Sequence, residues 1–108
     1  MPQPLISLIM TTYKQEAFVG AAVRSVLAQE HDNLEIHISD DCSPDGTFDI
    51  IRREVSAYQG PHRIHLHRNP VNIGPTRNTA EVMKRVKGDF VVRCHGDDIS
   101  MPDRVEVL

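Results

Sequence analysis

The chain has 108 residues and a mass of 12.2 kDa, a size that fits one compact domain and excludes a two-domain enzyme. Hydrophobic residues make up 40% of the chain and charged residues 25%, a balance that is typical of globular domains and excludes a disordered protein. The net charge of −3 argues against non-specific binding to nucleic acid, because that binding needs a basic surface.

Apolar periodicity predicts alternating strands and helices in the first half of the chain. A nearly continuous apolar run over 5–10 predicts a strand that is covered on both faces. Apolar pairs that recur every four residues predict a helix over 16–29, and strict alternation over 34–39 predicts a second strand. The Ser-Pro-Asp string at 43–45 predicts the start of a second helix, with a capping hydroxyl and a proline in the first turn.

The same alternation continues in the second half of the chain. Residues 64–66 alternate with histidines and predict a third strand, and residues 89–94 predict a fourth. Between them, residues 75–88 predict a third helix, which begins at a proline and ends at a glycine. The apolar face of this helix is expected to be Ala80, Met83 and Val86. The order βαβαβαβ predicts an α/β fold with a parallel sheet of about four strands and right-handed crossovers.

Polar residues follow each predicted strand, where the carboxyl ends of a parallel sheet collect ligands. Acid pairs stand at 40–41 and 97–98, and an Arg-Asn pair stands at 77–78. A carboxylate accepts the N–H of a nucleobase, and oxygen ligands bind Mg²⁺ or Mn²⁺. Because the chain has no Gly-x-x-x-x-Gly-Lys loop to cradle phosphates, the expected ligand is a nucleoside diphosphate that is held through a metal.

Each of these signals also has a purely structural explanation. The acids at 40–41 and 97–98 are also typical of turns and helix caps, and Arg77 is also typical of a solvated helix surface. His65 and His67 share a strand face and have metal-ligating side chains. We expect them to be solvent-facing strand residues, because no third ligand lies nearby in the sequence.

The two cysteines and the absence of targeting signals indicate the cellular compartment in which the chain is expected. Cys42 and Cys94 are too far apart for a metal-knuckle or redox motif, so we expect small, half-buried thiols in a reducing setting. The sequence contains no apolar run of ~18 residues and no signal-peptide pattern. We therefore expect a cytoplasmic location, with a longer parent protein at the cytoplasmic face of the membrane.

Two strings carry a resemblance to a known family. These are Asp-Asp-Cys-Ser-Pro-Asp-Gly-Thr at 40–47 and Asp-Asp-Ile-Ser-Met-Pro-Asp at 97–103, and the segments 6–13 and 72–78 match in order and spacing. Over nearly its whole length the chain resembles family 2 glycosyltransferases. The resemblance implies a Rossmann-like GT-A fold, a nucleotide-diphosphate sugar donor (a UDP-sugar above all), a divalent Mn²⁺ or Mg²⁺ ion, and a glycan or other hydroxyl acceptor in polysaccharide biosynthesis.

The resemblance also assigns nucleotide-binding residues. Asp41 would accept the ring N–H of a uracil-type base, Asp40 would support the loop, and Arg77 would face the nucleotide from the third helix. The nucleotide-binding residues implied in this way are Thr11, Thr12, Tyr13, Asp40, Asp41, Arg77 and Gly96. The chain departs from the family pattern at Thr11, where the family has proline, and at Lys14, where it has asparagine.

A metal site is implied by the same resemblance. Asp97 stands at the last position of the family's Asp-x-Asp motif and would ligate the metal, and Asp98 would support the site or contact the sugar. His95 replaces the first acid of that motif, with hydrogen bonding to ribose or ligation of Mn²⁺ as its two expected roles.

The resemblance places the catalytic base of the reaction later in the sequence. An inverting transfer needs a general base for the acceptor proton, and this family supplies it after the Asp-x-Asp region. We therefore expect the base beyond Leu108 and no catalytic residue within these 108 residues. Residues 1–108 are thus expected to be an N-terminal donor-binding portion that is inactive alone and self-associates through its exposed sheet edge.

Other classes of protein remain open at this stage. A sugar-nucleotide nucleotidyltransferase has a similar start, but it needs a glycine-rich loop after the first strand, which residues 11–14 do not provide. A receiver-like phospho-switch module has its acid pair after the first strand, whereas here the pair follows the second. A degenerate nucleotide-binding module without catalysis is the third alternative, because His95 interrupts the acidic motif.

Overall fold

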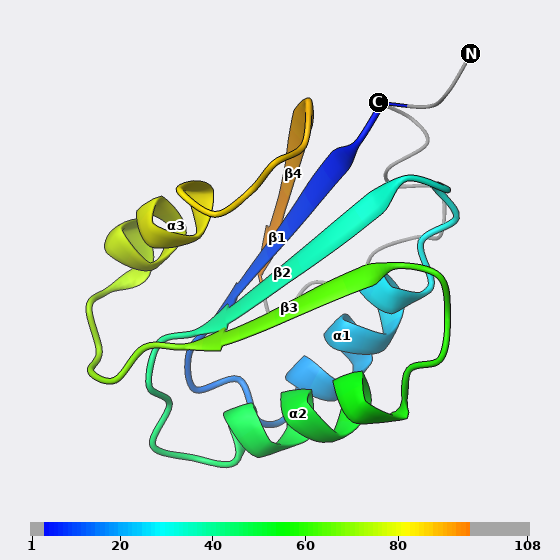
Figure 1. Cartoon of the computed structure of the whole chain (residues 1–108). Coiled ribbons are helices and arrows are strands. Elements are labelled where there is room, and N and C mark those ends of the chain that lie inside the picture. Colours follow the sequence, from blue (N-terminus) through cyan, green and yellow to red (C-terminus); the bar gives the residue numbers. More distant parts are fainter. Residues whose placement is uncertain (1–3, 96–108) are drawn as a thin grey trace.

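The computed structural model describes residues 4–95, which form a four-stranded parallel sheet with helices on both faces (Figure 1). In chain order the elements are β1 (Ile6–Thr12), α1 (Val19–Leu27), β2 (Leu34–Asp40), α2 (Thr47–Ala57), β3 (Arg63–Arg68), α3 (Pro75–Met83) and β4 (Phe90–His95). The predicted βαβαβαβ order and parallel sheet are confirmed. None of the helices within residues 4–95 is long and apolar enough to cross a bilayer.

The strand order is β3-β2-β1-β4, so the chain starts at the middle of the sheet and builds outward in both directions. The register pairs Thr12 of β1 with Asp40 of β2, and Asp40 in turn with Arg68 of β3. On the other side, Thr11 pairs with His95 of β4. The carboxyl ends of all four strands therefore meet along one edge, and the loops that follow them are brought together.

The main core lies between the sheet and the helices α1 and α2, which cover one of its faces, while α3 covers part of the other (Figure 1). Every residue of β1 is buried, as expected for a strand covered on both faces. The largest fully buried apolar side chains of the core include Leu8, Met10, Val19, Val23, Val26, Ile36, Ile38 and Ile51. The two cysteines are free thiols, with Cys94 buried and Cys42 half-buried, so no disulfide between them supports this core.

The start of α2 differs from the prediction for a reason that bears on the site. The helix begins at Thr47, and the hydroxyl of Ser43 does not cap it. That hydroxyl donates to Oδ1 of Asp40 at 2.7 Å. Asp45 instead accepts from the backbone N–H and the hydroxyl of Thr47, and these bonds lower the pKa of Asp45. Because the buried carboxylate of Asp40 takes the hydroxyl of Ser43, this serine does not cap the helix, and α2 begins later in the chain than predicted.

The start of α1 also differs from the prediction. This helix begins at Val19, three residues after the predicted start at 16.

The predicted buried face of α3 is wrong. Ala80 and Met83 are exposed, the helix ends at Met83, and the buried residues are Asn78 and Val82. The side chain of Asn78 accepts from Oγ of Ser39 at 2.7 Å and donates to the carbonyl of Ser39 at 3.1 Å. Because these hydrogen bonds turn the Asn78 side of the helix toward the sheet, Val82, one turn further on, is buried with it.

The orientation of α3 is tested by two neighbouring substitutions. Val82→Ala removes buried methyl groups and is expected to lower the free energy of unfolding by about 1–3 kcal/mol. Met83→Ala, on the exposed side, is expected to change it by less than about 0.5 kcal/mol. Urea denaturation followed by circular dichroism measures both values. A larger loss for Met83→Ala than for Val82→Ala would contradict this orientation.

Candidate functional site

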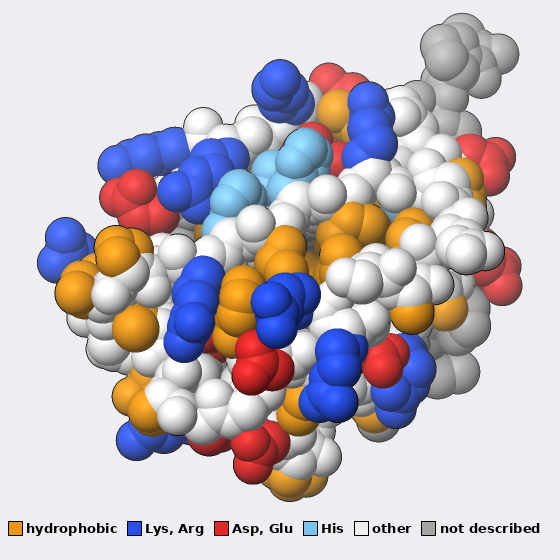
Figure 2. Space-filling model, turned by 60° about the horizontal axis from the view of Figure 1, so that its bottom comes forward, with side chains coloured by type: hydrophobic (Ala, Val, Ile, Leu, Met, Phe, Trp, Pro, Cys, Tyr) orange, Lys and Arg blue, Asp and Glu red, His pale blue; other side chains and the backbone are white. Residues whose placement is uncertain are grey.

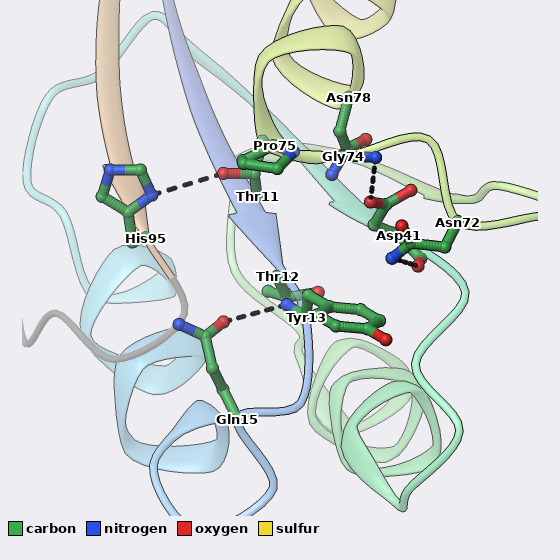
Figure 3. Close-up of a pocket in the computed structure, with 10 residues that line it drawn as sticks. All are labelled: Thr11, Thr12, Tyr13, Gln15, Asp41, Asn72, Gly74, Pro75, Asn78 and His95. Atoms are coloured by element: carbon green, nitrogen blue, oxygen red, sulfur yellow. Dashed lines mark hydrogen bonds between the residues drawn. The ribbon is translucent and has the colours of Figure 1, made fainter.

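A pocket of about 230 Å³ opens at the carboxyl ends of the strands, between them and the start of α3 (Figure 3). Its lining residues are Thr11, Thr12, Tyr13, Gln15, Asp41, Asn72, Gly74, Pro75, Asn78 and His95. They come from the end of β1 and the loop after it, from the end of β4, from the residue after β2, and from the first turn of α3 and the loop before it. This is the sheet edge at which ligands of parallel α/β folds are expected.

The carboxylate of Asp41 forms one wall of the pocket and holds the loop before α3. Its Oδ1 accepts from Nδ2 of Asn69 and from the backbone N–H of Ile73, each at 2.9 Å. Its Oδ2 accepts from the backbone N–H of Gly74 at 2.8 Å (Figure 3). A carboxylate offers about four acceptor positions, and these bonds fill three of them. No donor within residues 4–95 fills the last position, on Oδ2, which is left for a further N–H donor.

Gly74 connects this carboxylate to α3 and needs to be glycine. Its φ of 89° and ψ of 157° lie in a region that only glycine adopts without strain. While its N–H donates to Asp41, its carbonyl accepts from the N–H of Asn78 in the first turn of the helix, at 2.9 Å. The negative charge of Asp41 thus lies beside the N-terminus of α3, where the helix dipole stabilises it.

Asp40 lies behind the pocket wall and is fully buried. It accepts from the hydroxyl of Thr12 at 2.8 Å and from the backbone N–H and hydroxyl of Ser43 at 2.8 and 2.7 Å. Nε of Arg68 lies 3.9 Å from its Oδ2. Asp40 therefore ties the end of β1 to the loop after β2, and it does not line the pocket itself.

The mouth of the pocket carries groups that remain accessible. Tyr13 is 39% exposed, and its backbone N–H donates to Oε1 of Gln15 at 3.1 Å (Figure 3). Lys14 adopts a left-handed conformation with a φ of 52°, which asparagine, the residue of the resembled family here, tolerates better than lysine does. On the opposite side, Nδ1 of His95 lies 3.4 Å from Oγ1 of Thr11.

Most of the predicted site residues that fall within residues 4–95 lie together in the structure. The predicted residues that line the pocket are Thr11, Thr12, Tyr13, Asp41 and His95. Arg77 is exposed on α3 and does not line it. Sequence reasoning did not assign Gln15 or Asn72 to the site, although both line the pocket. The signal for both was their place in loops that follow β1 and β3.

Some of the predicted site lies outside the part of the chain that the structure describes. Gly96, Asp97 and Asp98 are outside the described residues, and so is Leu108, beyond which the catalytic base is expected. The metal ligand at Asp97 and the position of the base therefore stay predictions.

A second feature missed by sequence reasoning is the buried amide network beneath the pocket. Nδ2 of Asn69 donates both to Asp41 and to Oδ1 of Asn78, the latter at 3.0 Å. Both asparagines are buried, and Asn78 also reaches Ser39 on β2. Because these residues are far apart in sequence, only the folded chain reveals that they support one wall.

Comparison with known sequences gives a family match. Residues 7–108 match the sequence profile of glycosyl transferase family 2. Among curated proteins, the chain is 34% identical over 104 residues to the putative teichuronic acid biosynthesis glycosyltransferase TuaG of Bacillus subtilis. This similarity covers 96% of the chain and 40% of TuaG. The chain therefore spans less than half the length of this relative.

Solved structures with the same fold are also similar. The mannosyltransferase PcManGT from Pyrobaculum calidifontis, in complex with GDP-Man and Mn²⁺, matches with a TM-score of 0.84 and 21% identity, over 95% of this chain and 30% of that protein. S. aureus TarS in complex with UDP-GlcNAc matches with a TM-score of 0.81 and 24% identity, over 95% of this chain and 29% of TarS. Because both identities are below 25%, this structural similarity establishes a shared fold and nothing more.

The role of the Asp41 carboxylate is tested by Asp41→Asn. The amide turns an N–H₂ group toward one of the backbone or side-chain donors that the carboxylate now satisfies, so we expect a loss of about 2–3 kcal/mol in the free energy of unfolding. Asp49→Asn, at an exposed position on α2, is the matched control and should change it by less than about 0.5 kcal/mol. Equal stability of the two variants in urea would show that Asp41 does not hold the loop.

Proposed function

Because the chain belongs to glycosyl transferase family 2, we propose that its pocket binds the nucleotide of a nucleotide-diphosphate sugar, whose sugar the whole protein transfers to an acceptor hydroxyl. The family and the Rossmann-like GT-A fold are confirmed by the comparisons above. The structures of PcManGT with GDP-Man and of TarS with UDP-GlcNAc support a donor of this class.

The observation that carries the proposal is the free acceptor position of Asp41 beside the exposed ring of Tyr13. A nucleobase has a flat face that stacks on an aromatic ring and an edge that offers N–H groups. Uracil offers a single ring N–H, which matches the single position left on Oδ2 of Asp41. This match supports a UDP-sugar as the donor. Arg77, one residue before Asn78 on α3, is proposed to reach the nucleotide from the rim.

A divalent Mn²⁺ or Mg²⁺ ion completes the proposed donor site. His95 is the proposed metal-site residue that the structure describes, and its exposed ring lies at the pocket beside Thr11. An imidazole at 95 and carboxylates at 97 and 98 would supply a nitrogen and oxygen donor set of the kind that fits Mn²⁺. When bound, the ion supplies positive charge that stabilises the departing diphosphate. The Mn²⁺ in the PcManGT structure supports this part of the proposal.

The transfer itself requires groups beyond the donor site. The acceptor hydroxyl attacks the anomeric carbon as the nucleoside diphosphate leaves, and an inverting transfer needs a general base for the hydroxyl proton. We propose that this base and the acceptor pocket lie beyond Leu108, which is supported by the 40% of TuaG that the chain spans. The biosynthetic role in the name of TuaG supports a glycan acceptor and polysaccharide biosynthesis.

Two further expectations remain proposals. Two free thiols support a reducing, cytoplasmic location for this chemistry. Within the described residues β4 is an edge strand, and Phe90 at its start is exposed, which supports self-association of the isolated chain through this edge.

The proposed nucleotide site is tested by calorimetric titration of the chain with UDP in the presence of Mn²⁺. Tyr13→Ala removes the proposed stacking surface and is expected to weaken UDP binding about tenfold to a hundredfold, as for the loss of one base–aromatic stack. Tyr58→Ala changes the other tyrosine of the chain, which does not line the pocket, and should leave the affinity unchanged. If neither UDP nor GDP binds to the unmodified chain, the proposal is wrong.

The metal assignment is tested separately by Asp97→Ala. We expect this variant to lose the part of the UDP affinity that depends on Mn²⁺, because the variant lacks the carboxylate that would ligate the ion. The fold should be retained, which circular dichroism checks. Asp49→Ala, at an exposed position on α2, is the control. An Asp97→Ala protein with the same Mn²⁺-dependent affinity as the unmodified chain would exclude Asp97 as the ligand.

A further inference from the structure

The sheet carries a second group of titratable side chains, on the face that α1 and α2 do not cover. Glu35 and His37 alternate with core residues along β2, and the register places His65 of β3 directly opposite His37. His67 follows on the same face of β3. We call these four residues the histidine cluster. Histidine side chains gather at the surface among lysines and arginines in Figure 2.

The cluster lies away from the nucleotide pocket. None of its members lines that pocket, and His37 is four residues before Asp41 along an extended segment, which corresponds to about 13 Å. The cluster lines instead a separate hollow of about 250 Å³. The residues around this hollow are Glu35, His37, Arg63, His65, His67, Arg85 and Lys87.

The spacing of three side chains in the cluster is close to that of metal ligands. Nε2 of His37 lies 3.4 Å from Oε2 of Glu35, and Nε2 of His65 lies 4.0 Å from Oε1 of Glu35. One ligand atom from each of the three residues lies within 4.8 Å of the others. Tetrahedral Zn²⁺ with bonds of ~2.0–2.1 Å places its ligand atoms about 3.4 Å apart. His65 is 46% exposed, so its ring has room to rotate toward Glu35 when an ion binds.

The buried imidazole of His37 has an unsatisfied nitrogen in the middle of the cluster. Its side chain is 3% exposed, and within residues 4–95 Nε2 makes no hydrogen bond, although Oε2 of Glu35 lies 3.4 Å away. Buried polar atoms without partners are rare in folded proteins and costly. The other nitrogen, Nδ1, lies 3.4 Å from Nε2 of His67. This is the arrangement of a metal-ligating histidine, in which one nitrogen is free for the ion and the other is oriented by a neighbour.

Glu35 is held in place as a ligand would be. Its Oε2 accepts from the hydroxyl of Ser7 at 2.5 Å and from the backbone N–H of Lys87 at 2.7 Å. Burial raises the pKa of Glu35, and the bonds from Lys87 and Ser7 outweigh it, so that the pKa is lowered and the group is an anion. Burial lowers the pKa of His37 against the opposing attraction of Glu35, and this lowering favours the neutral ring. A fixed anionic carboxylate and a neutral imidazole are the protonation states that metal binding requires.

We propose that Glu35, His37 and His65 bind a divalent transition metal of the Zn²⁺ class, with His67 orienting His37 from behind. Two imidazoles and one carboxylate are typical ligands of Zn²⁺, Co²⁺ and Ni²⁺. The neighbouring charges of Arg63, Arg85 and Lys87 oppose any cation that is held mainly by electrostatic attraction. The site therefore selects ions that bond strongly to imidazole nitrogen and discriminates against Mg²⁺ and Ca²⁺. A bound ion would link the edge strand β3 to β2.

The experiment is a titration of the 108-residue chain with ZnCl₂ by calorimetry, and with CoCl₂ by visible absorption. The unmodified chain should bind one Zn²⁺ that excess MgCl₂ does not displace. His65→Gln removes a ligand at a position that is 46% exposed, so the fold should be kept, while the affinity for Zn²⁺ should fall at least ~10-fold. His31→Gln is the matched control, since it removes a histidine that lines neither the hollow nor the nucleotide pocket and should leave this affinity unchanged.

Several results would overturn the proposal. These are the absence of a one-to-one complex, an unchanged affinity in His65→Gln, an equal loss in His31→Gln, and near-ultraviolet thiolate bands in the Co²⁺ complex, which would place the ion on a cysteine. Glu35→Gln is a second variant and should also weaken binding at least ~10-fold. If it fails to fold because Ser7 and Lys87 lose their acceptor, the His65→Gln result still decides the question.

Discussion

The pocket depends on one buried carboxylate. Asp41 follows the last residue of β2, and its two oxygens accept from Asn69, Ile73 and Gly74, which all belong to the connection between β3 and α3. A buried anion is tolerated only where it is paired or hydrogen-bonded, so these bonds are needed to keep the charge inside the protein. The same bonds fix the connection between β3 and α3 against the sheet. They thereby position the parts of the pocket that come from the end of β2 and from the start of α3.

The rigid part of this arrangement is the parallel sheet. Because Thr12 is in register with Asp40, and Asp40 with Arg68, the loops after three strands leave the sheet at the same level. Asp40, buried beneath these loops, links the end of β1 to the loop after β2 through its hydrogen bonds to Thr12 and Ser43. A donor site in a glycosyltransferase needs a preorganised surface of this kind, since catalysis by charge stabilisation depends on groups that do not have to move. In the proposed nucleotide site, the accessible Tyr13 and the acceptor position that remains on Asp41 are the groups that would recognise the base.

The fold class was predictable from the sequence because it depends on local patterns. The period of two in residues 34–39 and the period near four around Val19 and Val23 identify strand and helix without knowledge of neighbours. The post-strand positions of Asp41 and Tyr13 followed from the same order, because parallel strands end at one edge. The resemblance to the family rests on strings that are continuous in the chain, and it was likewise available from the sequence alone.

Only the tertiary structure decided the features that depend on side chains from different segments. The hydroxyl of Ser43, expected as a helix cap, bonds to Asp40, and the orientation of α3 is set by the bonds between Asn78 and Ser39. His65 lacked a third ligand in the sequence, but the folded sheet supplies Glu35 and His37 from the neighbouring strand. In each case hydrogen bonds and strand register join groups whose partnership no local pattern records. The sequence determined the elements and their order, while the burial of polar groups determined which faces meet.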